Sequence, residues 1–308
     1  MSALWEAKFR TWSKPASDTE AEKQANAERM IRAAVREYPP LGPHDIKIIP
    51  QGSYRNNTNV RQESDVDICV CCTDTFFYDL GLADYTKAEA NIVDAAYSFA
   101  QFKTDVQNAL ETKFGKRGVS RGDKAFDVHE NTYRVDADVV AAFEYRLYKK
   151  RTLNAFLGAY VSEYVTPPGT KFYSDGGREV VNWPEQQYAN GVAKNDRTGN
   201  RFKSVVRALK SLKYEMEEKG VAEAKAIGSF LVECLVFNVP DNMFQGDSYF
   251  KNVRDCLAVC FAATSANGDS RGWLEVNGIK YLFHPSQPWT REQANEFTLA
   301  AWRYCGFS

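Results

Sequence analysis

Gln51-Gly52-Ser53-Tyr54 is the first half of the pattern that decides the fold, and Asp65-Val66-Asp67-Ile68 is the second. Because successive side chains of a strand point to opposite faces, Asp65 and Asp67 share one face of the predicted strand and the apolar residues share the other. Two carboxylates at this spacing repel each other unless a cation lies between them. Carboxylate oxygens suit Mg²⁺, which binds one or two of them together with substrate phosphates. We therefore predict a metal site at the start of an apolar strand.

The turn ahead of the acids supplies groups that a triphosphate needs. Gly52 lets backbone N–H groups approach a ligand closely, and Ser53 adds a hydroxyl donor. An isolated Asp-x-Asp is more often a solvated turn or a helix cap than a metal site. Here the pair leads into Ile68-Cys69-Val70-Cys71-Cys72, a run typical of a core. We interpret the turn and the acids together as a site for nucleotide transfer.

A third carboxylate comes from residues 133–143, which look like another buried strand. Two metal ions about 3.5–4 Å apart need more than two carboxylates. Asp138, which interrupts the apolar end of this strand, is our choice for the third ligand. Asp136 lies on the same face by the period of two and remains the alternative.

These motifs resemble the DNA polymerase β-like nucleotidyltransferase superfamily. Within it, the chain is most similar to the branch of oligoadenylate synthase, cyclic GMP–AMP synthase and the bacterial CD-NTases, over about residues 45–305. The Gly-Ser turn and the Asp-x-Asp pair are specific to the superfamily. The bacterial branch is indicated by residues 201–210, which resemble the helix of the triphosphate lysine, and by residues 227–240, which resemble a helix with a phosphate-side serine. Ala141 stands where many relatives have proline.

The resemblance implies an α+β fold with two lobes. A polymerase β-like nucleotidyltransferase lobe, a mixed sheet with helices, is expected in residues 1–150, and a mainly helical, oligoadenylate synthase-like lobe in residues 151–308. A long N-terminal helix over residues 18–37, opened by the capping box Ser17-x-x-Glu20, is expected to brace both lobes.

The resemblance also implies a reaction. A bacterial cyclic oligonucleotide synthase joins nucleoside triphosphates into a cyclic di- or trinucleotide, a second messenger of antiphage (CBASS) defence. Two Mg²⁺ ions, replaceable by Mn²⁺, would be held by Asp65, Asp67 and Asp138. The alternatives are a linear template-free transferase, of the oligoadenylate or RNA-tailing type, and an inactive nucleotide- or RNA-binding relative. Three retained acids argue against the inactive relative, because interior carboxylates are costly.

Further nucleotide-binding residues are expected in the second half of the chain. Lys210 matches the family's phosphate lysine, and Lys203 on the same helix is expected to assist. Such cations neutralise charge on the departing pyrophosphate. A cationic row beside an apolar helix face is otherwise a solvated rim. Ser229 is expected to contact phosphate, or to bond back to a carbonyl one turn earlier.

Three residues near the turn complete the expected nucleotide site. Tyr54 can stack on a base or pack inside the lobe. Thr58 offers a hydroxyl near the ribose or the phosphates, and the amide of Gln51 can donate to a phosphate or ribose oxygen.

Composition describes an ordinary globular protein: of 308 residues, 44% are hydrophobic and 26% are charged. The net charge of −1 lacks the basic excess that a long nucleic-acid partner requires. The expected partners are nucleoside triphosphates, ATP and GTP first, with pyrimidine triphosphates as an alternative. We expect a monomer and leave open a regulatory protein partner.

Location and cysteine chemistry follow from the same sequence. No apolar run approaches the roughly 20 residues of a membrane span, and the first residues lack the layout of a secretory signal, so we expect a cytoplasmic protein without membrane contact. The seven cysteines fit reduced core thiols. Cys69, Cys71 and Cys72 crowd together, but none of the three histidines lies beside them in the sequence, which favours core packing over a zinc site.

The remaining elements follow from periodicity and caps. The capping box Thr86-x-x-Glu89 predicts a helix that continues to Gly115, and Asp175-Gly176-Gly177 predicts a hairpin. Strands are expected at 45–49, 126–128 and 133–140, and helices at 198–219, 225–238, 248–263 and 290–304.

Overall fold

The structure is a computed structural model that describes residues 2–15, 17–60, 65–131, 134–154, 159–161 and 167–307. The chain forms two compact units. We call residues 19–52 and 65–185 the sheet unit, and residues 1–18, 53–64 and 186–308 the helical unit. Each is described by itself.

A mixed sheet forms the centre of the sheet unit, as the sequence predicts. Among the described residues, seven strands pair in the order β1-β2-β5-β4-β3, with β8 on the second half of β5 and β9 on β8. The β2–β5 pair is parallel and the other pairs are antiparallel. The strands are β1 (Ile46–Gln51), β2 (Val66–Leu82), β3 (Val119–Arg121), β4 (Phe126–Val128), β5 (Ala137–Lys149), β8 (Gly169–Tyr173) and β9 (Glu179–Asn182). A separate antiparallel pair is formed by β6 (Thr152–Asn154) and β7 (Ala159–Val161).

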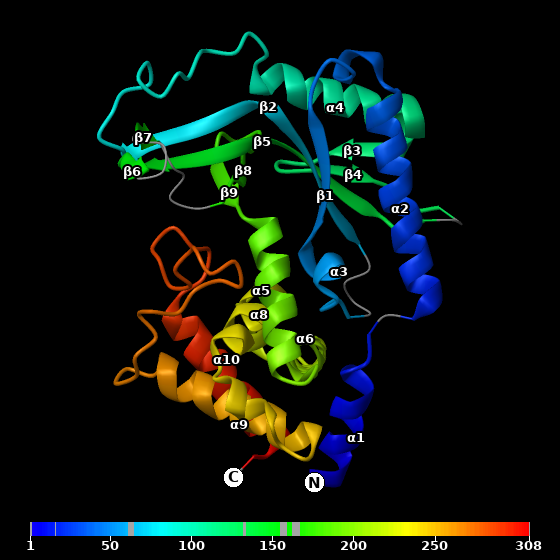
Figure 1. The fold of residues 1–308 in the computed structure, drawn as a ribbon. Coiled ribbons are helices and arrows are strands. Elements are labelled where there is room, and N and C mark those ends of the chain that lie inside the picture. Colours follow the sequence, from blue (N-terminus) through cyan, green and yellow to red (C-terminus); the bar gives the residue numbers. More distant parts are fainter. Residues whose placement is uncertain are drawn as a thin grey trace. The chain divides into compact units, whose positions relative to one another are not determined.

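Helices α2 (Asp18–Glu37) and α4 (Phe99–Phe114) lie along this sheet (Figure 1). The apolar side of α4 contacts β3, β4 and β5, and its Phe102, Val106 and Leu110 are fully buried. Burial of each such side chain stabilises the fold by about 1.5–3 kcal/mol. The sheet unit also contains the short 3₁₀ turns η1 (Pro39–Leu41) and η2 (Lys116–Gly118).

The helix predicted from Thr86 to Gly115 is shorter than expected, and this prediction is wrong for the residues before Phe99. The capping bonds between Thr86 and Glu89 are present, at 2.8 Å and 3.3 Å. However, Asn91 adopts a φ of 54°, which ends the turn, and α4 begins only at Phe99. Ser98 is its true cap, because its hydroxyl accepts from the Gln101 N–H at 3.2 Å.

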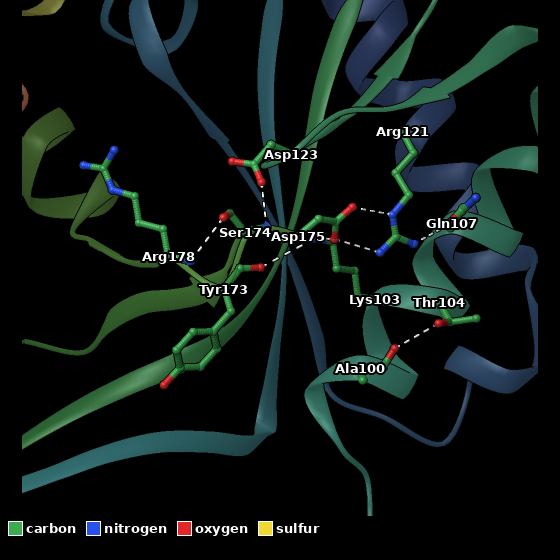
Figure 2. A network of polar contacts seen from close by, with 11 residues as sticks. Ala100, Lys103, Thr104, Gln107, Arg121, Asp123, Tyr173, Ser174, Asp175 and Arg178 are labelled. Carbon is green, nitrogen blue, oxygen red and sulfur yellow. Dashed lines mark hydrogen bonds and ion pairs between the residues drawn. The ribbon is translucent and has the colours of Figure 1, made fainter.

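The predicted hairpin is present, and its turn is tied to the rest of the sheet unit (Figure 2). The carboxylate of Asp175 accepts from Lys103 of α4 at 2.7 Å and from Arg121 of β3 at 2.7 Å and 2.8 Å. The N–H of Gly176 donates to Asp123 at 2.8 Å. One carboxylate therefore connects three elements that are distant in the sequence.

The helical unit packs its helices around one apolar core. On α6, the face of Phe202, Val205, Leu209 and Leu212 is buried, as its spacing predicts. The predicted helix 225–238 begins only at Ser229, because Gly228 is extended and caps it, and Lys225 ends the separate helix α7. The helices are α1 (Ser2–Trp12), α5 (Pro184–Arg197), α6 (Arg201–Glu218), α7 (Ala222–Lys225), α8 (Ser229–Asn238), η3 (Asp241–Phe244), α9 (Tyr249–Thr264) and α10 (Arg291–Cys305).

The predicted caps of α10 and the predicted free thiols of the cysteines are present. The capping box of Thr290 and Gln293 opens α10, and Gly306 closes it with a φ of 64°. All seven cysteines lie in the described part of the chain and are buried free thiols. Among the described residues, none of the helices combines the length and the apolar character that a membrane span needs.

Candidate active site

Polar residues form a row across four neighbouring strands of the sheet unit. Gln51 of β1 is in register with Asp67 of β2, Asp67 with Asp138 of β5, and Asp138 with Asp127 of β4. Residues in register on adjacent strands point to the same face, and their backbones lie about 4.8 Å apart. The sheet itself therefore places one amide and three carboxylates side by side.

Two further carboxylates flank this row. Asp65 directly precedes β2, and Asp136 precedes β5, where its carbonyl accepts from the Val66 N–H at 3.1 Å. Partial burial, followed by the charges of Asp127, Asp65 and Asp136, raises the pKa of Asp138. The acids thus lie within electrostatic reach of one another, and a divalent cation among them would relieve the repulsion. The oxygen-rich set fits Mg²⁺ or Mn²⁺.

The geometry favours Asp138 over Asp136 as the third ligand. Asp138 lies directly beside Asp67 in the parallel β2–β5 ladder. Asp136 lies outside the strand, and its carboxylate accepts a hydrogen bond from the backbone N–H of Glu130.

The Gly-Ser turn lies against the acid row. Gly52 has a φ of +67°, which is the left-handed region. A Cβ built on it would lie 1.8 Å from Oδ2 of Asp67, so no side chain fits here. Gly52 also begins the short helix α3 (Gly52–Asn56), and the first N–H groups of a helix point away from its body. The turn therefore offers backbone donors next to a carboxylate, with Ser53 and Tyr54 following in α3.

Within the helical unit, Lys210 and Thr58 belong to a buried polar triad. The Lys210 Nζ lies 3.4 Å from Oε2 of Glu233, and both side chains are almost fully buried. The Thr58 hydroxyl donates to the same Oε2 at 2.7 Å. Sequence analysis missed Glu233, although an acid inside the apolar helix 229–238 is itself a signal.

The other cations of α6 have different surroundings. Arg207 is buried, and its guanidinium donates to the carbonyls of Ser13, at 2.8 Å, and Asn57. Burial lowers the pKa of Arg207 to about 10. Arg207 thus fixes the segment after α3 onto α6. Burial also lowers the pKa of Lys203, whose Nζ lies 5.8 Å from the Tyr188 ring.

Tyr188 and Ser229 are further candidates for ligand contact. Tyr188 is 38% exposed and has the Arg55 guanidinium 4.6 Å from its ring centroid, so two cations lie near this aromatic ring. Nothing in the sequence singled out Tyr188. Ser229 is the first residue of α8, so no earlier turn of that helix is available for the back-bond considered above.

Residues not singled out from the sequence extend the acid row. Asp127 lies 3.6 Å from Nδ1 of His129, and the Ser120 hydroxyl lies 2.8 Å from Nε2 of the same ring. The alternating spacing of Asp127 and His129 on a predicted strand was the available signal. They make this edge of the sheet rich in ligand atoms.

The sheet with its acid row and the helical second half define a polymerase β-like nucleotidyltransferase. Residues 28–120 match the profile of the nucleotidyltransferase domain. Residues 189–306 match the profile of the cGAS/DncV-like nucleotidyltransferase C-terminal helical domain. The chain belongs to the cGAS/DncV-like nucleotidyltransferase (CD-NTase) family, which confirms the resemblance seen in the sequence.

Two characterised relatives cover nearly the whole chain. A cyclic dipyrimidine nucleotide synthase, CdnE, of Legionella pneumophila is 51% identical over 305 residues, 99% of each protein. A cyclic dipurine nucleotide synthase of Elizabethkingia meningoseptica is 37% identical over 299 residues, 96% of each protein.

Two solved structures have the same fold. The Rhodothermus marinus CdnE c-UMP-AMP synthase with Apcpp and Upnpp aligns with a TM-score of 0.82 and 31% identity, over 98% of this chain and 97% of the other. The Elizabethkingia meningoseptica CdnE cyclic dinucleotide synthase with GTP and Apcpp aligns with a TM-score of 0.77 and 34% identity, over 98% of this chain and 99% of the other. The protein is a nucleotidyltransferase, as the sequence predicts.

Proposed function

We propose that this protein is a cyclic dinucleotide synthase, which joins two nucleoside triphosphates through ribose hydroxyls and releases pyrophosphate. The observation that carries the proposal is the in-register pair Asp67–Asp138 with Gly52 packed against Asp67. The linear, template-free alternative is not favoured, because relatives matching almost the entire chain are named as cyclic nucleotide synthases.

Pyrimidine triphosphates are the proposed first substrates. The relative that is 51% identical is named a cyclic dipyrimidine nucleotide synthase, and so is a second one from Cecembia lonarensis at 37% identity. ATP and GTP remain in the proposal, because the solved relatives hold GTP, Apcpp and Upnpp. We place the enzyme, as a monomer, in the bacterial cytoplasm, where its product would act as a second messenger in antiphage (CBASS) defence.

Each group in the acid site has a chemical task. Two Mg²⁺ ions, bound by Asp65, Asp67 and Asp138, would lower the pKa of the acceptor hydroxyl and balance the phosphate charge. The in-register carboxylates of the β2–β5 pair would help to orient the acceptor hydroxyl toward the α-phosphorus. Gly52 permits close approach of the triphosphate to the backbone, while Ser53 donates its hydroxyl.

The basic and hydroxyl groups complete the proposed assignment. Lys210 neutralises charge on the leaving pyrophosphate, and a phosphate oxygen competes with Glu233 for its ammonium. We propose that the phosphates are supported by Lys203, Thr58 and Ser229. Gln51 is proposed to contact the ribose or a phosphate, and Tyr54 the base. Thr58 would support the phosphates indirectly, because its hydroxyl donates to Glu233 and so positions that carboxylate beside Lys210.

The test is product analysis from mixed nucleotides. The purified protein is incubated with ATP, GTP, CTP, UTP and Mg²⁺, and the product is treated with phosphatase and identified by mass spectrometry. A phosphatase-resistant dinucleotide, with pyrimidines enriched, is the expected result. Phosphatase-sensitive oligomers would instead identify a linear transferase, and a product that persists in Asp67→Asn would overturn the site.

A further inference from the structure

Three potential metal ligands meet near the middle of β2, away from the acid row. They are His44, which precedes β1, Cys72 in β2, and Asp74 two residues later. The His44 Nδ1 lies 3.0 Å from Oδ2 of Asp74, and the Cys72 thiol donates to Oδ1 of Asp74 at 2.7 Å. All three ligand atoms lie within 4.8 Å of one another.

The backbone holds this cluster in place. Ile46 pairs with Cys72 in the β1–β2 ladder, and the N–H and hydroxyl of Thr73 both donate to the carbonyl of Asp45, at 2.8 Å and 3.1 Å. The register of β2 against β5 shifts between Cys72 and Phe76. Asp74 lies within this irregular stretch and contacts His44.

The three ligands differ in exposure in a way that suits an ion entering from solvent. Cys72 is fully buried, whereas the side chains of His44 and Asp74 are 19% and 32% exposed. The Tyr97 ring stacks on His44, with centroids 3.9 Å apart, and its hydroxyl donates to Asp105 at 2.7 Å. The imidazole is thereby held in one plane, above a buried thiol.

We propose that His44, Cys72 and Asp74 bind a Zn²⁺ ion, with water as the fourth ligand. Thiolate, imidazole and carboxylate are the ligands of zinc sites, and tetrahedral zinc separates its ligand atoms by about 3.3–3.7 Å. Small side-chain rotations would convert the observed separations of 2.7 Å and 3.0 Å into this geometry. Mg²⁺ is not the expected ion, since it prefers oxygen ligands only.

Binding exchanges one ion for one proton. The Cys72 thiol carries a proton, which it donates to Asp74. Zn²⁺ replaces the thiol proton, which passes to solvent, and leaves Cys72 as a coordinated thiolate.

This cluster is separate from the acid row. Asp67 and Cys72 lie on opposite faces of β2, and five residues of strand span about 17 Å. An ion here ties the segment before β1 to β2 and stabilises the sheet unit. The cysteine trio that the sequence assigned to the core is therefore divided: Cys69 and Cys71 pack in the core, whereas Cys72 has polar neighbours.

The test uses Co²⁺ as a spectroscopic substitute for zinc. The full-length protein is freed of metal with a chelator and titrated with Co²⁺. We expect a thiolate-to-cobalt charge-transfer band and tetrahedral d–d bands that saturate at one ion per chain and disappear when Zn²⁺ is added. A cation at the acid row gives no thiolate band, so the two sites are distinguished.

Variants assign the ligands. Cys72→Ser should abolish the charge-transfer band, while Cys69→Ser, on the same strand in the apolar core, is the matched control and should retain it. Asp74→Asn is the second variant, to be used if Cys72→Ser fails to fold, because asparagine has a shape similar to aspartate. It should weaken Co²⁺ binding by at least about tenfold and remove the rise in Tm that Zn²⁺ causes. The absence of a thiolate band in the unmodified protein, or its persistence in folded Cys72→Ser, would show that the proposal is wrong.

Discussion

The acid row of the sheet unit and the buried lysines of the helical unit treat charge in opposite ways. The acid row gathers like charges, because Asp127, Asp65 and Asp136 all raise the pKa of Asp138. The helical unit buries lysine ammonium groups beside carboxylates: Lys210 lies 3.4 Å from Glu233, and Lys194 lies 2.8 Å from Asp241.

This contrast predicts how a lost charge changes the stability of the folded protein in each place. A cluster of carboxylates raises the free energy of the folded protein until a cation joins it, whereas removing one partner of a buried pair leaves an ion in a poor environment. Neutralising one charge should therefore have opposite consequences in the acid row and in the buried pairs. Single substitutions in each place test this expectation for stability.

Asp67→Asn should separate activity from stability in the sheet unit. We expect pyrophosphate release to fall by about 10⁴-fold, or about 5.5 kcal/mol in the activation barrier, because a ligand of the reacting centre is lost. The metal-free Tm should stay the same or rise, since like-charge repulsion decreases. Initial rates and thermal melts measure both, with Asp94→Asn, on the exposed surface of the same unit, as the control. A lower metal-free Tm for the active-site variant would contradict the contrast between the units.

Glu233→Gln should have the opposite effect on stability. The change leaves the buried Lys210 ammonium without this carboxylate, so we expect the free energy of unfolding to fall by about 3 kcal/mol. Urea unfolding measures it. Thr58→Val, which removes only the hydroxyl bonded to Glu233, is the matched control and should cost about 1 kcal/mol. Equal effects of the two changes would show that the ion pair itself contributes nothing.

Gly52→Ala sharpens the link between the turn and the acids. Its Cβ would lie 1.8 Å from Oδ2 of Asp67, and the φ of +67° is unfavourable for alanine. We expect the Asp67 carboxylate to move and kcat/KM to fall by about 100-fold, or about 2.7 kcal/mol. Gly177→Ala, also at positive φ but with open space around it, should leave kcat/KM unchanged. If both alanines behave alike, backbone strain rather than displacement of Asp67 is the cause.

Asp175 provides the smallest and most pH-sensitive test. Arg121 first and Lys103 second hold the pKa of Asp175 well below its ordinary range. A folded-state pKa below the unfolded one adds stability above about pH 4, and this stability is lost as the pH falls toward the folded value. Because the carboxylate is partly exposed, we expect Asp175→Asn to cost only about 1 kcal/mol at pH 7.

The measurement for Asp175 is urea unfolding at pH 7, 5 and 3. The difference between the original protein and Asp175→Asn should shrink at pH 3. Asp269→Asn removes a fully exposed pair with Arg271 and should show no measurable difference at any pH. A difference for Asp175 that is independent of pH would assign its effect to hydrogen bonding rather than charge.

Local patterns predicted the acids, while pairing across the sheet remained invisible in the sequence. Asp65 and Asp67 follow from strand alternation, and the mixed sheet and C-terminal helices follow from periodicity and caps. Asp127 enters the row only through the register of β4 on β5. His44 and Asp74 are 30 residues apart, and only the β1–β2 ladder and a bulge bring them together.

Local sequence patterns also gave wrong or incomplete predictions where contacts with distant residues determine the structure. The bonds between Thr86 and Glu89 form as a capping box should, yet no long helix follows, because the left-handed Asn91 diverts the chain before Ser98. Glu233 was missed because its partner Lys210 comes from another helix, so its burial cannot be recognised from the apolar run around it.

The register of β2 on β5 has one more consequence. Since hydrogen-bonded backbones set the separation of Asp67 and Asp138, the spacing of the reactive carboxylates belongs to the ladder and not to the surrounding loops. For that reason, the spacing of these carboxylates should be preserved wherever the paired strands form. A designer who transplants residues 46–53, 65–72 and 137–143 as paired strands into another scaffold should transfer the arrangement of its acids intact.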